Sequence, residues 1–128
     1  MKKLLLLAIL LIGMMGFAQK EQFVRDYSQV LPTNKEGKST GWKEISSRFF
    51  FNYGGDTTKV KVYVGDIAIT LSQEGLTERD VTEGGFGYQK MILIDDESLD
   101  MVLLQYFDLQ QYGVRLIFTD GSSIQFTN

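Results

Sequence analysis

Four short apolar segments, separated by turn residues, occupy the last forty residues of the chain. They are rich in β-branched and aromatic residues, have the length of strands, and end in Asp, Glu, Ser, Gly or Gln. They cover residues 88–94, 101–107, 114–118 and 124–127. Connections this short cannot return a chain for parallel pairing, so the pattern predicts an antiparallel meander.

Three earlier segments, residues 45–53, 59–64 and 67–71, also have strand character. Between the last two stands Gly65-Asp66, which is typical of a two-residue type II′ hairpin. A further, polar edge strand is expected over residues 76–82. Together these segments extend the meander toward the N-terminus.

The residues of the last hairpin select its register. A two-residue turn would set polar residues opposite apolar ones. A three-residue loop over residues 119–121 sets Leu116 opposite Ile124 instead. It also sets Val114 opposite Phe126, with the final glycine of the loop in a left-handed conformation. Directly opposed residues share a face, so we predict the three-residue loop.

The predicted sheet is apolar on both faces in places. Phe49, Phe50 and Phe51 are consecutive, and alternation turns Phe50 away from the other two. We expect the segment from Phe23 to Leu31 to cover Phe50. The alternative is a homodimer through that face, because exposed apolar patches mark interaction sites.

Residues 19–32 have helical spacing, with Phe23, Tyr27 and Val30 recurring every three or four residues. Pro32 would end such a helix. A short helix is favoured here over an extended N-terminal strand.

About eight strands are expected in all, counting the segment 76–82. Eight is the number whose barrel interior is just filled by side chains or holds one small ligand. The sequence therefore predicts an all-β fold, an antiparallel up-and-down meander closed into a small barrel. A two-sheet sandwich is the alternative.

The N-terminus has the features of a secretory signal peptide. Lys2 and Lys3 precede a short apolar run, and small residues stand at Gly16 and Ala18. We expect cleavage after Ala18, export to the periplasm or medium, and no stable membrane insertion afterwards. The predicted organisation is a signal peptide over 1–18, a segment and connector over 19–41, and a β domain over 42–128.

The charge balance argues against two classes of partner. Without Lys2 and Lys3, the 13 basic residues become 11 against 16 acidic ones, a net charge of −5. No basic cluster appears, so nucleic acid and anionic membrane surfaces are poor candidate partners. There is no Cys, so the fold depends on packing rather than on disulfides.

The absence of His and Cys removes the common catalytic groups. It excludes a Ser-His-Asp triad, a thiolate nucleophile and an ordinary zinc site. Catalysis is therefore the minority interpretation, and it would take the form of a small hydrolase built on carboxylates. No cofactor is expected.

Two loop motifs invite functional interpretations. The acidic segment 95–100 has the oxygen ligands that calcium prefers, but its spacing fits an ordinary hairpin loop better. The glycine-rich segment Gly84 to Gly87 leads into a strand rather than a helix, which argues against a phosphate cradle. We expect no metal at the first, and a flexible linker or lid carrying Phe86 at the second.

Aromatic residues near strand ends are the remaining candidates for a binding site, because Tyr and Trp combine an apolar body with a polar tip. The predicted ligand-binding residues are Trp42, Tyr53, Phe86 and Tyr88. The function expected is an exported, non-catalytic binding module for a small apolar ligand or a protein partner, as a monomer or homodimer. A structural or interaction component of the cell envelope is the alternative, ahead of the hydrolase.

Overall fold

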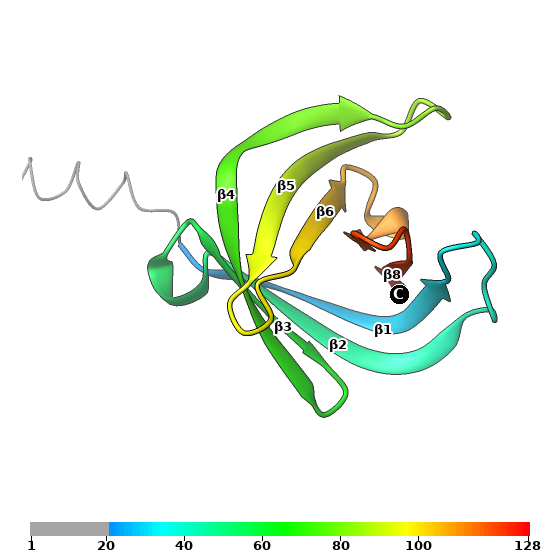
Figure 1. The fold of residues 1–128 in the computed structure, drawn as a ribbon, viewed down its shortest axis with the longest axis horizontal. Coiled ribbons are helices and arrows are strands. Elements are labelled where there is room, and N and C mark those ends of the chain that lie inside the picture. Colours follow the sequence, from blue (N-terminus) through cyan, green and yellow to red (C-terminus); the bar gives the residue numbers. More distant parts are fainter. Residues whose placement is uncertain (1–20) are drawn as a thin grey trace, which may run out of the picture.

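The computed structural model describes residues 21–128, which form a closed barrel of eight antiparallel strands (Figure 1). Each strand pairs with its neighbours along the chain, and the first pairs with the last. The barrel consists of β1 (Phe23–Thr33), β2 (Lys43–Phe51), β3 (Lys59–Val64), β4 (Ile67–Val81), β5 (Gly87–Asp95), β6 (Met101–Phe107), β7 (Val114–Phe118) and β8 (Ser123–Thr127). The fold class predicted from the sequence is confirmed, and the predicted signal peptide lies outside the described residues.

The prediction of an N-terminal helix is wrong, because residues 23–33 form strand β1. This strand closes the barrel by pairing with β2 through Phe23 to Val30 and with β8 through Gln29 to Thr33. The register shifts between Tyr27 and Gln29, which marks a β-bulge. At this shift Ser28 of β1 stands against two residues of β2, Ile45 and Ser46, and Tyr27 and Val30 on either side of it are both buried. A strand whose register shifts against its neighbour can therefore show the same three-residue spacing as a helix.

The count of eight strands is right, although two of its members differ from the prediction. β1 adds a strand where a helix was favoured. The expected edge strand over 76–82 is the second half of the long strand β4, not a separate element. The register of β4 against β5 shifts between Glu74 and Glu78, so three residues oppose Met91 alone. This irregularity bends β4 without ending it.

Both predicted hairpin registers are confirmed. Val64 pairs with Ile67 across the turn at Gly65, whose φ of 56° is the left-handed value that the first position of a type II′ turn requires. In the last hairpin Leu116 pairs with Ile124 across a three-residue loop.

A continuous apolar core fills most of the barrel. Phe49, which is fully buried, has its ring centroid 4.9 Å from that of Phe126, 5.7 Å from Tyr27 and 5.9 Å from Phe51. The other buried members are Val30, Val60, Val62, Leu71, Leu93, Val102, Leu104, Val114 and Leu116. Every strand contributes at least one residue to this core, so the core connects all sides of the barrel wall.

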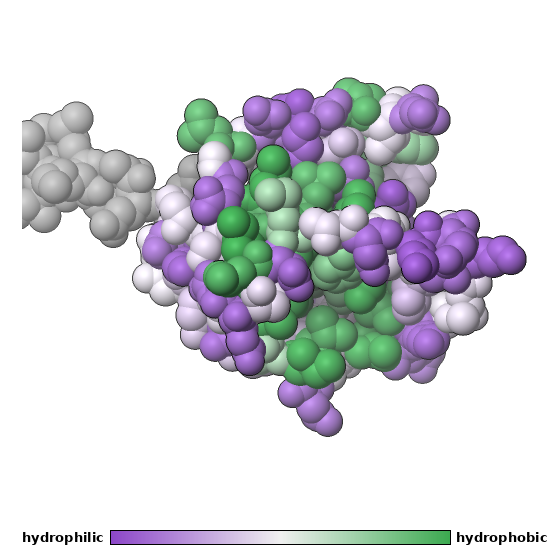
Figure 2. Space-filling model, viewed as in Figure 1, coloured by the Kyte–Doolittle hydropathy of each residue, from purple (hydrophilic) through white to green (hydrophobic). Residues whose placement is uncertain are grey.

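The residues that cover Phe50 on the outer face of β2 are not the predicted ones. Segment 23–31 is part of the barrel wall and does not lie over Phe50. Instead, the half-buried Phe50 packs edge-on against Tyr53 and Tyr63, at centroid distances of 5.9 Å and 5.8 Å. Lys61 lies over both tyrosine rings. Elsewhere the surface keeps apolar residues, which spread across the middle of the face in Figure 2 with polar residues around them.

The buried Tyr27 gives stability a dependence on alkaline pH. Burial, aided by the nearby Tyr106 hydroxyl, raises the pKa of Tyr27 to about 12. In the unfolded chain the same group ionises near pH 10. The contribution of the neutral Tyr27 to the free energy of unfolding is therefore fully present below pH 10. As the pH rises toward 12, the free energy of unfolding falls by up to about 3 kcal/mol. Urea unfolding at pH 9 to 12 should show a steeper loss for wild type than for Tyr27→Phe. Parallel pH profiles for the two proteins would contradict the assignment.

Candidate functional site: a cavity at the barrel mouth

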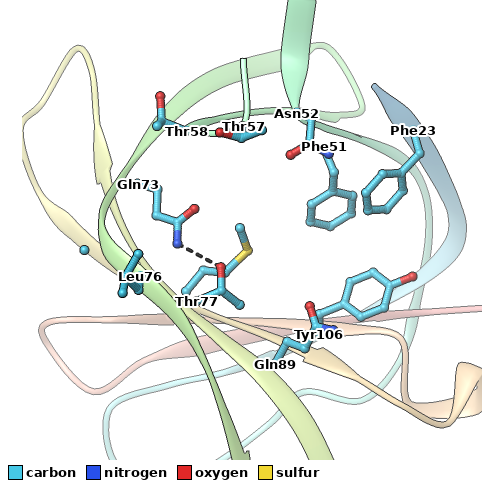
Figure 3. Close-up of a pocket in the computed structure, with 12 residues that line it drawn as sticks. Phe23, Phe51, Asn52, Thr57, Thr58, Gln73, Leu76, Thr77, Gln89 and Tyr106 are labelled. Carbon is cyan, nitrogen blue, oxygen red and sulfur yellow. Dashed lines mark hydrogen bonds between the residues drawn. The ribbon is translucent and has the colours of Figure 1, made fainter. Parts of the chain in front are cut away.

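One end of the barrel is hollow. A cavity of about 750 Å³ opens there, between the start of β1, the end of β2, the β2–β3 loop and the middle of β4 (Figure 3). β5 and β6 supply the remaining wall. The lining residues are Phe23, Phe51, Asn52, Thr57, Thr58, Gln73, Gly75, Leu76, Thr77, Gln89, Met91 and Tyr106.

The cavity exists because the core stops short of this end. Leu71 and Leu93 fill the barrel below, but the next lining positions on the same two strands are Gln73 and Met91. β4 pairs with β3 only as far as Ser72. Farther on it pairs with β5 alone, through the bulge that contains Gly75 with a φ of 77°. Small and polar residues on a bent strand leave the mouth unfilled.

One side of the cavity is an aromatic cluster. Phe23 stacks on Phe51 with 4.8 Å between ring centroids. Tyr106 meets both rings edge-on, at 5.3 Å from Phe51 and 6.5 Å from Phe23. Figure 3 shows these three rings together on one side, across the cavity from Gln73 and Thr58. Such a surface suits an apolar ligand and keeps a phenol hydroxyl for a polar contact.

The rest of the lining is polar but uncharged. The Gln73 side-chain amide donates to Thr77 Oγ1 at 2.9 Å, and the Asn52 amide donates to the Glu21 carbonyl at 3.1 Å. No charged side chain is among the residues that line the cavity in the described part of the chain. The cavity therefore offers apolar contact and a few hydrogen-bonding groups.

Two carboxylates, Asp56 beside the cavity and Asp26 on the outer surface, are held in local contacts. Asp56 accepts hydrogen bonds from the Thr58 hydroxyl and backbone N–H, which lower the pKa of its carboxyl. The hydrogen bond from Arg48 lowers the pKa of Asp26 on the outer surface. A hydrolase of the carboxylate type needs an acid whose pKa is raised. These two groups are shifted in the opposite direction.

The structure does not gather the four predicted ligand-binding residues around one pocket. Trp42 precedes β2, at the opposite end of that strand from Phe51. Phe86 and Tyr88 belong to an outer aromatic cluster with Phe107 and Tyr112, in which the Phe86 and Tyr112 ring centroids are 4.7 Å apart. None of the four lines the cavity at the mouth.

Tyr53 is turned outward by the residue before it. Alternation along β2 would place its side chain on the inner face with Phe49 and Phe51. The strand ends at Phe51, however, and Asn52 adopts a left-handed conformation with a φ of 54°. Asn tolerates this conformation better than most residues. It starts a single 3₁₀ turn, η1 (Tyr53–Gly55), that leaves Tyr53 against Phe50 outside.

Sequence reasoning missed the residues that do line the cavity. Alternation correctly turns Phe51 inward, and Tyr106 shares the inner face of β6 with buried Leu104. Alternation along a strand does not show how far along the barrel axis each inward side chain lies. Only the pairing of β1 with β2 brings Phe23 beside Phe51.

Local hydrogen bonds account for both loop motifs. In the acidic loop, Asp95 Oδ1 accepts from the backbone N–H groups of Glu97 and Ser98, and Asp96 pairs with Lys59. Across residues 21–128, no three His, Cys, Asp or Glu side chains gather as a metal site would need. The glycine-rich segment is a tight turn in which Thr82 N–H donates to the Phe86 carbonyl.

Among the described residues, no helix has the length and apolar character required to span a membrane. Comparisons of the chain with protein-family models, with curated proteins and with solved structures found no match. The cavity at the barrel mouth is therefore the feature of this chain that points to a function.

Proposed function

We propose that this protein is a non-catalytic binding module that holds a small, largely apolar molecule in the cavity at the barrel mouth. The observation that carries the proposal is the hollow end of an otherwise filled barrel, walled by Phe23, Phe51, Met91 and Tyr106. Its volume of about 750 Å³ is in the range of pockets that take small molecules, roughly 300 to 1,000 Å³.

The character of the lining supports binding rather than catalysis. Binding needs a rigid scaffold, a concave apolar surface and a few oriented polar groups. The closed barrel supplies the scaffold, and Gln73, Thr77 and Gln89 supply amide and hydroxyl groups. Acid–base chemistry near neutral pH would need a group that titrates there. Tyr106 is the one titratable residue of the lining.

Native mass spectrometry of the protein purified from its natural host tests this proposal. We expect a mass excess that disappears on denaturation, together with release of a small organic molecule. A bare protein that also fails to bind a panel of hydrophobic fluorophores would contradict the proposal. It would favour the alternative of a protein-interaction component.

A blocking substitution tests the location of the site. Gln89 is exposed and lines the mouth, so Gln89→Trp should occupy the cavity with an indole ring. We expect ligand affinity to fall at least about tenfold, equal to roughly 1.4 kcal/mol, in a fluorophore titration. Gln110→Trp is the matched control, because Gln110 is also exposed but does not line the cavity. Equal affinities of the two variants would place the site elsewhere.

A further inference from the structure

One charged side chain, Arg25, contacts two aromatic residues of the cavity lining, although it is exposed and does not itself line the cavity. Arg25 pairs in register with Phe49, whose ring is in the core, so both side chains belong to the inner face of the barrel. Its Nε donates to the Tyr106 hydroxyl at 2.9 Å, and its guanidinium carbon lies 4.9 Å from the Phe23 ring centroid. Both of these partners line the cavity.

Arg25 has no carboxylate partner within residues 21–128. The ion pairs there are made by Arg48, Lys59, Arg79 and Lys90. Residues 1–20 contain no Asp or Glu at all. Arg25 shares this lack of an ion pair with Lys35, Lys38, Lys43, Lys61 and Arg115, but among these six it is the one that contacts residues lining the cavity.

The hydrogen bonds of Arg25 leave donors free. A guanidinium has five N–H groups. Arg25 uses Nε toward Tyr106 and Nη1 toward the Val24 carbonyl. Because the Tyr106 oxygen accepts from Arg25, its own hydrogen can donate elsewhere, and the described residues give it no acceptor. Three N–H groups of Arg25 and the O–H of Tyr106 thus remain available beside the aromatic side of the cavity.

We propose that the ligand is an amphipathic monocarboxylate, whose carboxylate binds Arg25 and the Tyr106 hydroxyl while its apolar part lies against Phe51 and Met91. Guanidinium groups match carboxylates in geometry and charge, and such charge-assisted hydrogen bonds are stronger than neutral ones. This inference rests on the proposed function and names the chemical class of the ligand.

The charge of Asp56 favours the same orientation. Asp56 is hydrogen-bonded to Thr58, and Thr58 lies across the cavity from Tyr106 (Figure 3). A ligand carboxylate is repelled from the Asp56 side and attracted to the Arg25 side. The apolar chain then lies along Phe51 and Met91, in a lining that contains no charged side chain.

A purely structural role for Arg25 makes a different prediction. The first half of β1 pairs with β2 but not with β8, so Arg25 also ties this free edge to β6. If that were its whole role, removing the guanidinium would weaken every ligand alike. Selectivity between a carboxylate and a neutral ligand of the same length separates the two roles.

The experiment compares octanoate, decanoate and dodecanoate with the corresponding primary alcohols, by isothermal titration calorimetry on residues 19–128. Wild type should bind the best acid about 10- to 100-fold more tightly than its alcohol, as expected for hydrogen bonds to a charged group. Arg25→Met should lose this preference while its affinity for the alcohol stays within about threefold, because the apolar contacts remain. Tyr106→Phe should lose part of the preference.

Arg48→Met is the control, since it removes one arginine from the outer surface of the same barrel and should keep the preference. Equal binding of acid and alcohol by wild type would overturn the carboxylate assignment and leave the binding module standing. An equal loss for both ligands in Arg25→Met would assign Arg25 a structural role. Binding of neither ligand class by wild type would refute this inference, and the fluorophore titration decides whether the module itself fails too.

Discussion

Gly113→Ala is expected to abolish stable folding of the barrel. Gly113 is buried between the single 3₁₀ turn η2 (Gln110–Tyr112) and β7, with a φ of 58° and a ψ of −123°. A Cβ at this position would lie 1.8 Å from the Phe126 carbonyl oxygen and 3.2 Å from the Tyr27 ring. The first of these neighbours is backbone in a paired strand, so it cannot rotate away. The alanine must therefore displace β8 from β7 or β1.

The expected cost exceeds about 4 kcal/mol, a large share of the roughly 5–15 kcal/mol that stabilises a domain. Gly55→Ala is the matched control, because Gly55 also has a positive φ, 80°, but nothing within 4 Å of its added Cβ. It should lose only the conformational penalty of about 1–2 kcal/mol. Urea unfolding followed by circular dichroism measures both variants. A Gly113→Ala protein as stable as Gly55→Ala would contradict the close approach of Phe126.

The second large effect is expected from Phe49→Ala. Phe49 is fully buried and contacts Tyr27, Phe51 and Phe126, so its removal leaves a cavity in the middle of the core. Truncating a buried Phe typically costs about 3–5 kcal/mol, from lost transfer free energy and the unfilled space. We expect a loss of this size in the free energy of unfolding, with the urea midpoint falling accordingly.

Its sequence neighbour provides the control. Phe50 points outward, is half-buried, and packs against Tyr53 and Tyr63. Phe50→Ala should cost roughly 1–2 kcal/mol, because solvent already reaches the ring and can fill the space it leaves. Equal losses for the two variants would mean that the outer cluster stabilises the barrel as much as its core does.

Local residue chemistry was sufficient to predict most of the barrel. Turn residues placed the hairpins, and opposed apolar residues such as Leu116 and Ile124 selected the register. Alternation separated Phe49 and Phe51 from Phe50. These features depend on contacts between residues close in sequence, whose energies the sequence pattern expresses directly.

Local chemistry was not sufficient for β1. The spacing of Phe23, Tyr27 and Val30 fits a helix as well as a strand whose register shifts against its neighbour. What decides between them is the pair of unpaired edges that β2 and β8 would otherwise expose. That requirement arises only when strands nearly one hundred residues apart come together.

The candidate site was the part that the sequence alone determined least. Trp42, Tyr53, Phe86 and Tyr88 have the right chemistry for a binding site but lie away from the cavity. Binding by any of these four stays a prediction. The left-handed Asn52, a single residue, decides the position of Tyr53.

The sequence by itself determined an antiparallel meander with a mainly apolar interior, favoured a barrel over a two-sheet sandwich, and contained no His or Cys for catalysis. Only the tertiary structure decided that side chains fill most of the barrel interior and leave one end hollow. The position of each inward side chain along the barrel axis depends on the stagger between strands and on the register shifts between β1 and β2 and between β4 and β5. Those offsets bring Phe23, Phe51 and Tyr106 to one mouth, with Arg25 in contact with Phe23 and Tyr106, because eight separate pairings must close on each other at once.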